Sequence, residues 1–188
     1  MSSQSNESVT PQSLKGSKTE QNLHTALSGE SQAALRYGWF AQKAKAQGMI
    51  SVSNLFEQTA NNEVEHAEIW FRYLGGYHNT EENLEVAANG EHFEWEKMYA
   101  QFAREAREEG FDTVADLFDR IASVEKHHEA NFRAVSAELE SGRIFASDDP
   151  NQKWICLNCG YVYEGKEPPT FCPACTHPKG YFEKKKQC

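Results

Sequence analysis

The chain has 188 residues and a formal net charge of −9, so it can form one large core with a small appendage. The negative charge argues against nucleic-acid and anionic-membrane partners, and no apolar run approaches the about 20 residues that span a bilayer. The first residues lack the basic region and apolar stretch of a secretory signal. Four of the five cysteines form two C-x-x-C pairs, which favours metal binding over disulfides in a cytoplasmic protein.

The predicted elements are mainly helical. Residues 1–18 are rich in Ser, Gln, Asn and Lys, which predicts a disordered tail. Helices are expected over about 19–47, 51–74, 89–109 and 112–140, with a short helix near 81–87 in the connection between the second and third. Residues 19–146 therefore form a predicted four-helix bundle, and residues 147–188 form a linker and a second, small domain.

An internal repeat relates the two halves of the bundle. A shift of 62 residues places Glu63 on Glu125 and His66 on His128. The same shift relates further aromatic and small residues, among them Tyr37 with Tyr99 and Phe56 with Phe118. Two helical hairpins of one design therefore follow each other in the chain.

Glutamates and histidines lie on the apolar stripes of these helices, where unpaired charges would be costly to bury. Residues three apart share a helix face, so each Glu-x-x-His pair can bind one ion. Carboxylates and imidazoles suit iron or manganese, and the pattern is typical of a carboxylate-bridged dimetal centre in a four-helix bundle. Such a centre can pass two electrons to a bound dioxygen species. The predicted ligands are Glu30, Glu63, His66, Glu91, Glu94, Glu125 and His128.

Two alternatives accompany this prediction. Some of these glutamates could instead extend to solvent or pair with Arg36, Arg72 or Arg120. Tyr37 and Tyr99 are expected to hydrogen-bond the carboxylates, although each could also be an ordinary core aromatic residue.

One irregularity in the repeat has a structural consequence. Glu30 precedes Tyr37 by seven residues, close to two α-helical turns, whereas Glu91 precedes Tyr99 by eight. An extra residue in an unbroken helix makes a π-bulge, which predicts a local i→i+5 hydrogen bond somewhere in the segment from about Glu91 to Tyr99.

The tail carries Cys156, Cys159, Cys172 and Cys175, whose spacing is typical of a tetrahedral metal site. Zinc would make this site structural, whereas one iron would make it a one-electron carrier. We expect iron, since the bundle is predicted to exchange electrons. Four aromatic residues are expected to shield the site: Trp154, Tyr161, Tyr163 and Phe171. Cys188 is predicted to be a free terminal thiol without a role.

The combination of these motifs from Thr19 to the carboxy-terminus resembles rubrerythrin. The resemblance implies a homodimer with a ferritin-like bundle, two non-haem irons and a rubredoxin-like domain holding one iron on four thiolates. It also implies reduction of hydrogen peroxide with electrons from a separate NAD(P)H-dependent reductase. On reduction, one iron would move from Glu94 to His66. The chain departs from the usual rubredoxin pattern at Thr176, where glycine is common.

The predicted function is therefore that of a peroxidase in oxidative-stress defence. No glycine pattern for a dinucleotide is present, so another protein must oxidise NAD(P)H. Two alternatives remain. One is a ferritin-like protein that oxidises or stores iron, and the other is a non-enzymatic electron carrier or zinc-stapled module.

Overall fold

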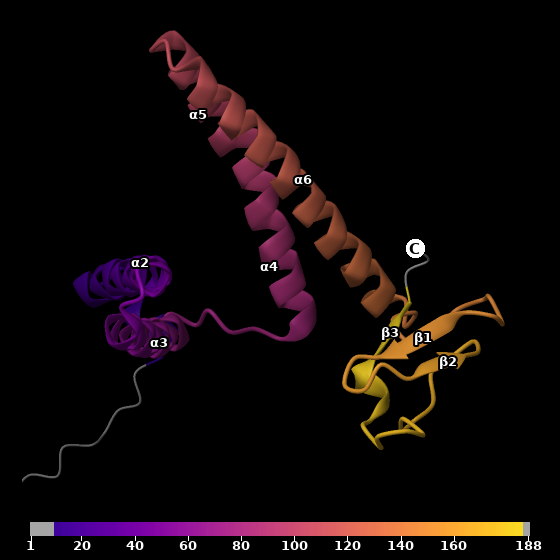
Figure 1. Ribbon diagram of the computed structural model, residues 1–188. Helices are drawn as coiled ribbons and strands as arrows, with labels where there is room; N and C mark the ends of the chain where they lie inside the picture. The colour runs from indigo at the N-terminus through magenta and orange to yellow at the C-terminus, as the bar shows by residue number, and fades with distance from the viewer. Residues whose placement is uncertain (1–9, 186–188) are drawn as a thin grey trace, which may run out of the picture. The chain divides into compact units, whose positions relative to one another are not determined.

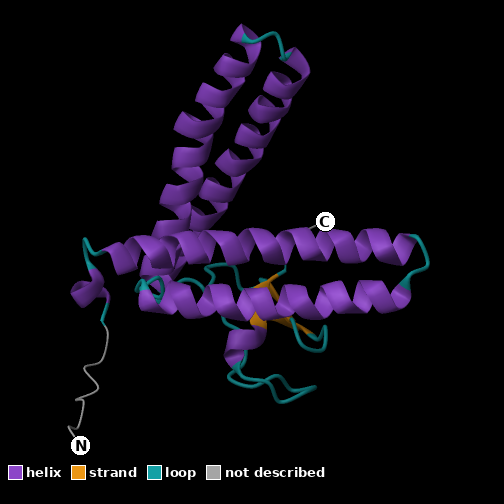
Figure 2. Cartoon of the chain, turned by 90° about the vertical axis from the view of Figure 1, so that its left-hand side faces the viewer, coloured by secondary structure: helices purple, strands orange, loops and turns teal. Residues whose placement is uncertain are grey.

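The computed structural model describes residues 10–185. The chain divides into two compact units, Met1–His78 and Asn79–Cys188. Each unit contains one helical hairpin, and the second also contains a small antiparallel sheet (Figures 1 and 2). No helix in the described part of the chain is long and apolar enough to cross a membrane.

The first hairpin consists of α2 (Lys18–Ala46) and α3 (Ile50–Tyr73), which lie side by side (Figure 2). Ser17 caps α2 by accepting a hydrogen bond from the Glu20 backbone N–H. Small side chains allow the two helices to approach closely near the turn: the Ser53 hydroxyl donates to the Ala41 carbonyl at 3.0 Å, and both residues are buried.

A short helix, α1 (Pro11–Leu14), precedes this hairpin. Residues 10–18 thus differ from the predicted disordered tail, while residues 1–9 lie outside the described part. The local reason is a capping box between Thr10 and Ser13, with Pro11 at the first helical position and Leu14 buried. Composition alone did not reveal this cap.

The second hairpin begins with α4 (Thr80–Phe93), continues through a π-helix, η1 (Glu94–Met98), into α5 (Tyr99–Glu108), and returns as α6 (Asp112–Glu140). The predicted break between a short helix and a third helix is wrong, because α4 runs through both. An Asn79–Glu82 capping box starts α4 early, and Gly90 stays inside the helix without a positive φ.

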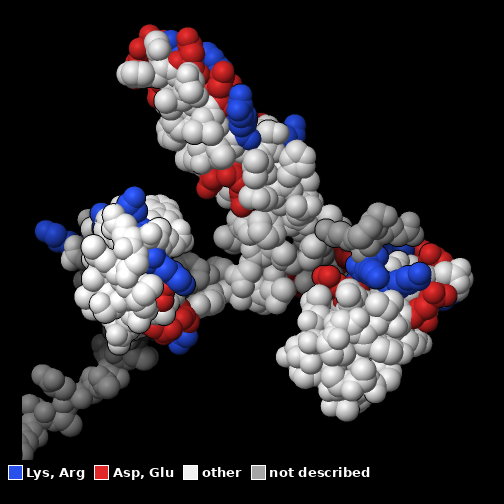
Figure 3. Space-filling model, in the orientation of Figure 1, with Lys and Arg blue, Asp and Glu red and all other residues white. Residues whose placement is uncertain are grey.

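The two hairpins repeat the same packing near their turns. Ala103, Ala106 and Ala115 are buried at the positions that Ala41, Ala44 and Ser53 occupy in the first hairpin. Beyond this contact, Arg107 pairs with Asp116 and Asp119 across the α5–α6 turn. Figure 3 shows acidic and basic side chains side by side at that end of the hairpin.

The carboxy-terminal domain is a three-stranded antiparallel sheet in the order β2-β1-β3. Its strands are β1 (Lys153–Cys156), β2 (Val162–Glu164) and β3 (Phe182–Lys184), and a 3₁₀ turn, η2 (Lys179–Tyr181), leads into β3. Its core contains Trp154, Cys156, Cys172 and Phe182, with Tyr163 and Cys175 packed against it. Two of the expected shielding residues, Tyr161 and Phe171, are instead exposed.

Candidate metal centres

The first hairpin brings together three of the predicted ligands. Glu30 comes from α2, and Glu63 and His66 come from α3; one ligand atom of each lies within 4.8 Å of the other two. His66 Nδ1 lies 2.8 Å from the Glu63 carboxylate, while the His66 side chain is about half exposed. This cluster, the first triad, offers two carboxylates and one imidazole on a single face of the hairpin.

The second hairpin builds the matching cluster, the second triad, from Glu91 on α4 and Glu125 and His128 on α6. His128 Nδ1 lies 2.6 Å from Glu125 and 3.8 Å from Glu91. Burial and then the nearby Glu125 carboxylate raise the pKa of Glu91. Because two partly buried carboxylates repel each other, a bound cation would relieve this cost, so the donor set fits a metal ion.

Glu94 lies in neither of the triads that the described residues form. Its negative charge nevertheless lies close enough to contribute to the raised pKa of Glu91. The structure thus assembles six of the seven predicted bundle ligands in two triads, one in each hairpin. Their union in one dimetal centre with Glu94 stays a prediction.

Each predicted tyrosine packs in an aromatic triplet. Tyr37 stands 6.4 Å from Phe40 and 6.2 Å from Phe56, measured between ring centroids. In the second hairpin, Tyr99 packs in the same way on Phe102 and Phe118, at 6.3 and 5.9 Å. Burial, followed by the charges of Glu94, Glu125 and Glu91, raises the pKa of Tyr99, so its hydroxyl lies near the second triad.

The predicted π-bulge is confirmed. The Tyr99 backbone N–H donates to the Glu94 carbonyl, an i→i+5 hydrogen bond that closes η1. A π-turn holds about one residue more than an α-turn, so the eight residues from Glu91 to Tyr99 cover about two turns. The extra residue therefore returns Tyr99 to the side of the helix that carries Glu91.

One alternative to metal binding was an ion pair between a predicted ligand glutamate and Arg72. Arg72 pairs with Glu68, which is not a predicted ligand and also accepts a hydrogen bond from the Tyr77 hydroxyl.

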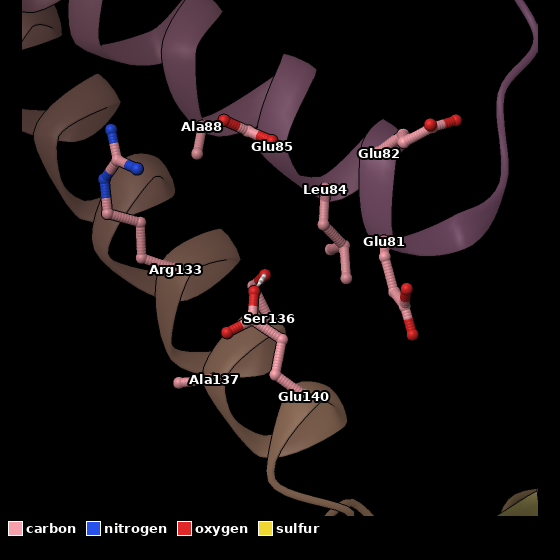
Figure 4. A pocket seen from close by; sticks show the side chains of 9 residues that line it. All are labelled: Glu81, Glu82, Leu84, Glu85, Ala88, Arg133, Ser136, Ala137 and Glu140. Carbon is pink, nitrogen blue, oxygen red and sulfur yellow. Dashed lines mark hydrogen bonds between the residues drawn. The ribbon is translucent and has the colours of Figure 1, made fainter.

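A separate pocket lies between α4 and α6 (Figure 4) and contains none of the predicted ligands. Its lining residues are Glu81, Glu82, Leu84, Glu85, Ala88, Arg133, Ser136, Ala137 and Glu140.

The four tail cysteines form the third cluster, again within 4.8 Å and without disulfides. The Cys156–Cys175 and Cys159–Cys172 Sγ–Sγ distances are both 3.7 Å. A tetrahedron of thiolates about 2.3 Å from a central metal has edges of roughly 3.8 Å, so the four sulfurs fit one metal ion.

Two similar backbone turns hold these sulfurs. In the first, the Gly160 N–H donates to the Cys156 carbonyl at 2.8 Å; in the second, the Thr176 N–H donates to the Cys172 carbonyl at 2.8 Å. Both residues have positive φ, 76° for Gly160 and 61° for Thr176. The predicted departure at Thr176 therefore leaves the loop geometry intact and places a β-branched residue in a left-handed conformation.

The residue after each turn points its backbone N–H at a sulfur. The His177 N–H, together with hydrogen bonds from neighbouring side chains, lowers the pKa of Cys175 to about 6. The Tyr161 N–H lowers the pKa of Cys159, but the hydrogen bond with Cys175, burial and the other two cysteines together raise it to about 12. A metal bound by all four thiolates would displace the remaining protons.

The three clusters lie in the two segments of the chain that match known protein-family models. Residues 21–136 match the family model Rubrerythrin, and residues 154–183 match the model of the rubrerythrin rubredoxin-like domain. The chain belongs to the rubrerythrin family.

Known rubrerythrins are similar to this chain over nearly their whole length. The rubrerythrin of Nitratidesulfovibrio vulgaris is 44% identical over 184 residues, covering 91% of this chain and 96% of the relative. Rubrerythrin-1 of Clostridium acetobutylicum is 42% identical, with the same coverage. The rubrerythrin of Porphyromonas gingivalis is 44% identical, covering 91% of this chain and 92% of the relative.

Membership of the rubrerythrin family confirms the predicted fold class, a mainly α ferritin-like domain followed by a small rubredoxin-like β domain. It also confirms the predicted cofactor set: a diiron domain with Glu/His sites and a four-cysteine site able to hold one metal.

Sequence reasoning missed one prominent residue beside the second triad. Glu129 follows His128 and is buried, with hydrogen bonds to side chains of α4 and η1. Its signal was weak, because a glutamate next to an apolar stripe is usually solvated.

Proposed function

We propose that this rubrerythrin-family chain reduces hydrogen peroxide to water, using electrons that reach the helical domain through the four-cysteine site. The observation that supports this most is the presence of two Glu/His triads and one four-thiol cluster in a single chain. An iron-storage protein needs the triads but not the thiols, and a simple electron carrier needs the thiols but not the triads.

The first triad would hold one iron and the second triad the other, with Glu94 as an additional carboxylate. An iron pair held there would, once reduced, supply the two electrons needed to cleave the oxygen–oxygen bond. Each hydrogen peroxide then takes two electrons and two protons and yields two waters. The carboxylates would compensate the change in metal charge, and the family resemblance implies that Glu94 and His66 would be the two ligands that exchange at one iron.

Tyr99 would serve as a hydrogen-bond donor at this site. Because burial and three neighbouring carboxylates raise its pKa, its hydroxyl keeps its proton at neutral pH. Tyr37 occupies the corresponding place in the first hairpin and would act in the same way. Neither tyrosine needs to lose its proton for peroxide reduction.

The remaining parts of the proposal concern the electron supply. The four-cysteine site would hold one iron, with zinc as the alternative, and would accept single electrons from a separate NAD(P)H-dependent reductase. The four described cysteines carry free thiols, which suits the reducing cytoplasm. We propose a homodimer as the working assembly and oxidative-stress defence as its role.

The test uses the full iron-loaded chain, reduced without oxygen and then mixed with either hydrogen peroxide or dioxygen. Peroxide should reoxidise the iron faster, with one equivalent consumed for each iron pair. Faster reoxidation by dioxygen would favour the iron-oxidising or iron-storing alternative.

A cysteine variant separates the two sites. Cys172→Ser should abolish iron–thiolate absorption and reductase-linked turnover, while the chemically reduced variant still consumes one equivalent of peroxide. Cys188→Ser removes the fifth thiol and serves as the matched control that keeps both activities. Loss of the single turnover in a folded Cys172→Ser variant would contradict this division of labour.

A further inference from the structure

Glu129 on α6 is the one charged residue among residues 10–185 that is buried, with 9% of the residue's surface exposed. A buried carboxylate is stable only when hydrogen-bond donors surround it. Here the donors come from three side chains. Trp95 Nε1 donates to Oε2 at 2.6 Å, His92 Nδ1 lies 3.1 Å from the same oxygen, and Arg133 Nε donates to Oε1 at 2.7 Å. We name these four residues the Glu129 clamp.

The outer contacts of the clamp keep its members in place. Arg133 also reaches from α6 to α4, where its Nη2 donates to Asn89 Oδ1 at 3.3 Å; Figure 4 shows its side chain on α6 opposite α4. Lys126 stands over the Trp95 ring at 4.8 Å, and the His92 and Trp95 rings meet edge to face at 5.2 Å. The carboxylate thus ties α6 to the opposite helix through His92 and Trp95, and Arg133 adds its own contact with Asn89.

The clamp is in register with the predicted ligands. His92 follows Glu91, Trp95 follows Glu94, and Glu129 follows His128. One residue along an α-helix turns the side-chain direction by about 100°, so the clamp forms a strip beside the strip that carries the second triad. The two strips share the same helices.

The clamp also spans the junction at which the helix changes type. His92 belongs to the end of α4, and Trp95 is the second residue of η1. An i→i+5 turn is rare, and nothing in backbone geometry alone decides which residues of a helix absorb the extra one. His92 and Trp95, which flank the start of Glu94–Met98, both contact one carboxylate on α6.

We infer that Glu129 is a positioning residue, which fixes the π-helix through His92 and Trp95 and so sets the place of Glu94 beside the second triad. This inference rests on the proposed function only in assuming that the second triad binds metal. The first hairpin agrees with it: Ala67 stands where the repeat would place Glu129, and α2 contains no π-helix.

The first test needs neither metal nor peroxide. In the metal-free full chain, Glu129→Gln removes the charge at nearly constant shape. Amide hydrogen exchange of residues 95–99 should then accelerate about tenfold, with α3 unchanged, because local opening is controlled by local contacts. The matched control is Glu138→Gln, which removes a carboxylate from the same helix, where it pairs with Lys184. The control should leave exchange at residues 95–99 unchanged.

The second test measures metal binding instead of activity. Ferrous iron is titrated without oxygen into chains whose four-cysteine site already holds zinc. Glu129→Gln should weaken one of the two iron-binding steps by about tenfold, the lower end of the effect of removing a supporting hydrogen bond at a metal site. Glu138→Gln should bind iron like the parent chain.

Trp95→Phe provides a second variant should Glu129→Gln not fold, since it removes the indole N–H and its five-membered ring but leaves the carboxylate in place. It should change both measurements in the same direction by a smaller factor. Unchanged exchange at residues 95–99 in the folded variants would overturn the inference. Faster exchange with unchanged iron affinity would also overturn it, because the clamp would then stabilise the helix without positioning a ligand. Failure of peroxide reduction alone would affect only the proposed function.

Discussion

The two helical hairpins carry the same triad and the same aromatic triplet on different helices. In the first hairpin a regular α-helix, α2, joins Glu30 to Tyr37 in seven residues. In the second, one extra residue lies between Glu91 and Tyr99, and η1 absorbs it. The insertion therefore keeps the repeated side chains in equivalent positions and changes only the segment between them, which contains Glu94 and Trp95.

This difference shows how a repeated unit can take up an extra residue without losing its packing. A π-turn accommodates one residue at nearly constant helix rotation, whereas an insertion in a regular helix would turn every later side chain by about 100°. The π-turn weakens the local backbone hydrogen bonds, and in the second hairpin the side-chain hydrogen bonds of the Glu129 clamp offset this cost. The first hairpin has neither the turn nor the clamp.

The largest expected effect comes from removing matched ligands, which tests the similarity of the hairpins. Glu63→Ala and Glu125→Ala should each leave one iron fewer bound in the helical domain. Each should lower peroxide turnover by more than about 100-fold, because losing a ligand exceeds the 10–100-fold effect of losing an outer partner. Metal analysis and peroxide consumption measure these changes. Glu138→Gln is the control, and unequal iron losses would show that the triads are not equivalent.

A smaller effect is expected when the difference between the hairpins is removed. Deleting the exposed residue Glu96 should convert η1 into α-helix and give the second hairpin the seven-residue spacing of the first. The free energy of unfolding should change by no more than about 1 kcal/mol, because Tyr99 keeps its helix face. Peroxide turnover should fall by about tenfold to 100-fold, because Glu94 is displaced.

The reciprocal deletion provides the contrast. Because α2 contains no π-turn that could absorb a deletion, removing the exposed residue Gln32 should rotate Glu30 and Tyr37 apart by about 100°. The first hairpin should then lose both its triad and much of its stability. Denaturant unfolding and peroxide assays on both deletions separate the two cases. Equal destabilisation by the two deletions would contradict the role assigned to η1.

Much of this arrangement could be predicted from local patterns. The bounds of α6 agree with the predicted helix over 112–140, since its apolar stripe is regular and Gly110 ends the preceding turn. The ligand pairs three residues apart needed only helix periodicity, and the mismatch between Glu30 and Glu91 was enough to predict η1. Each of these inferences depends on residues close together in the chain.

The features that were predicted wrongly or missed depend on contacts between residues that are distant in the chain. A helix boundary was predicted between residues 87 and 89, but α4 packs on α6 and runs through this point. Glu129 has donors 34 and 37 residues away, which no periodicity reveals. In the small domain, Phe182 from the last strand fills the core while Phe171 stays exposed, because the pairing of β3 with β1 decides which aromatic side chain is enclosed.

The two turns that hold the cysteines allow a second comparison, because each places one residue in the left-handed region: Gly160 has a φ of +76° and Thr176 a φ of +61°. A residue with a Cβ costs about 1–2 kcal/mol in the left-handed region, and a β-branched side chain is especially unfavourable there. Glycine removes that cost but loses about 0.5–1 kcal/mol through its freedom in the unfolded chain. Thr176 also has a compensating contact, since its hydroxyl donates to the Cys175 carbonyl at 2.7 Å.

These opposing terms make Thr176→Gly the smallest expected effect. It should stabilise the zinc-loaded domain by about 0.5 kcal/mol, because the relief of the left-handed strain slightly exceeds the lost hydroxyl contact and the added chain entropy. Gly160→Ala is the matched change in the other turn and should destabilise the domain by about 1 kcal/mol. The measurement is the denaturant midpoint at which the full chain releases zinc. A lower midpoint for Thr176→Gly would show that the hydroxyl contact outweighs the strain, and the two turns would then owe their shared shape to different forces.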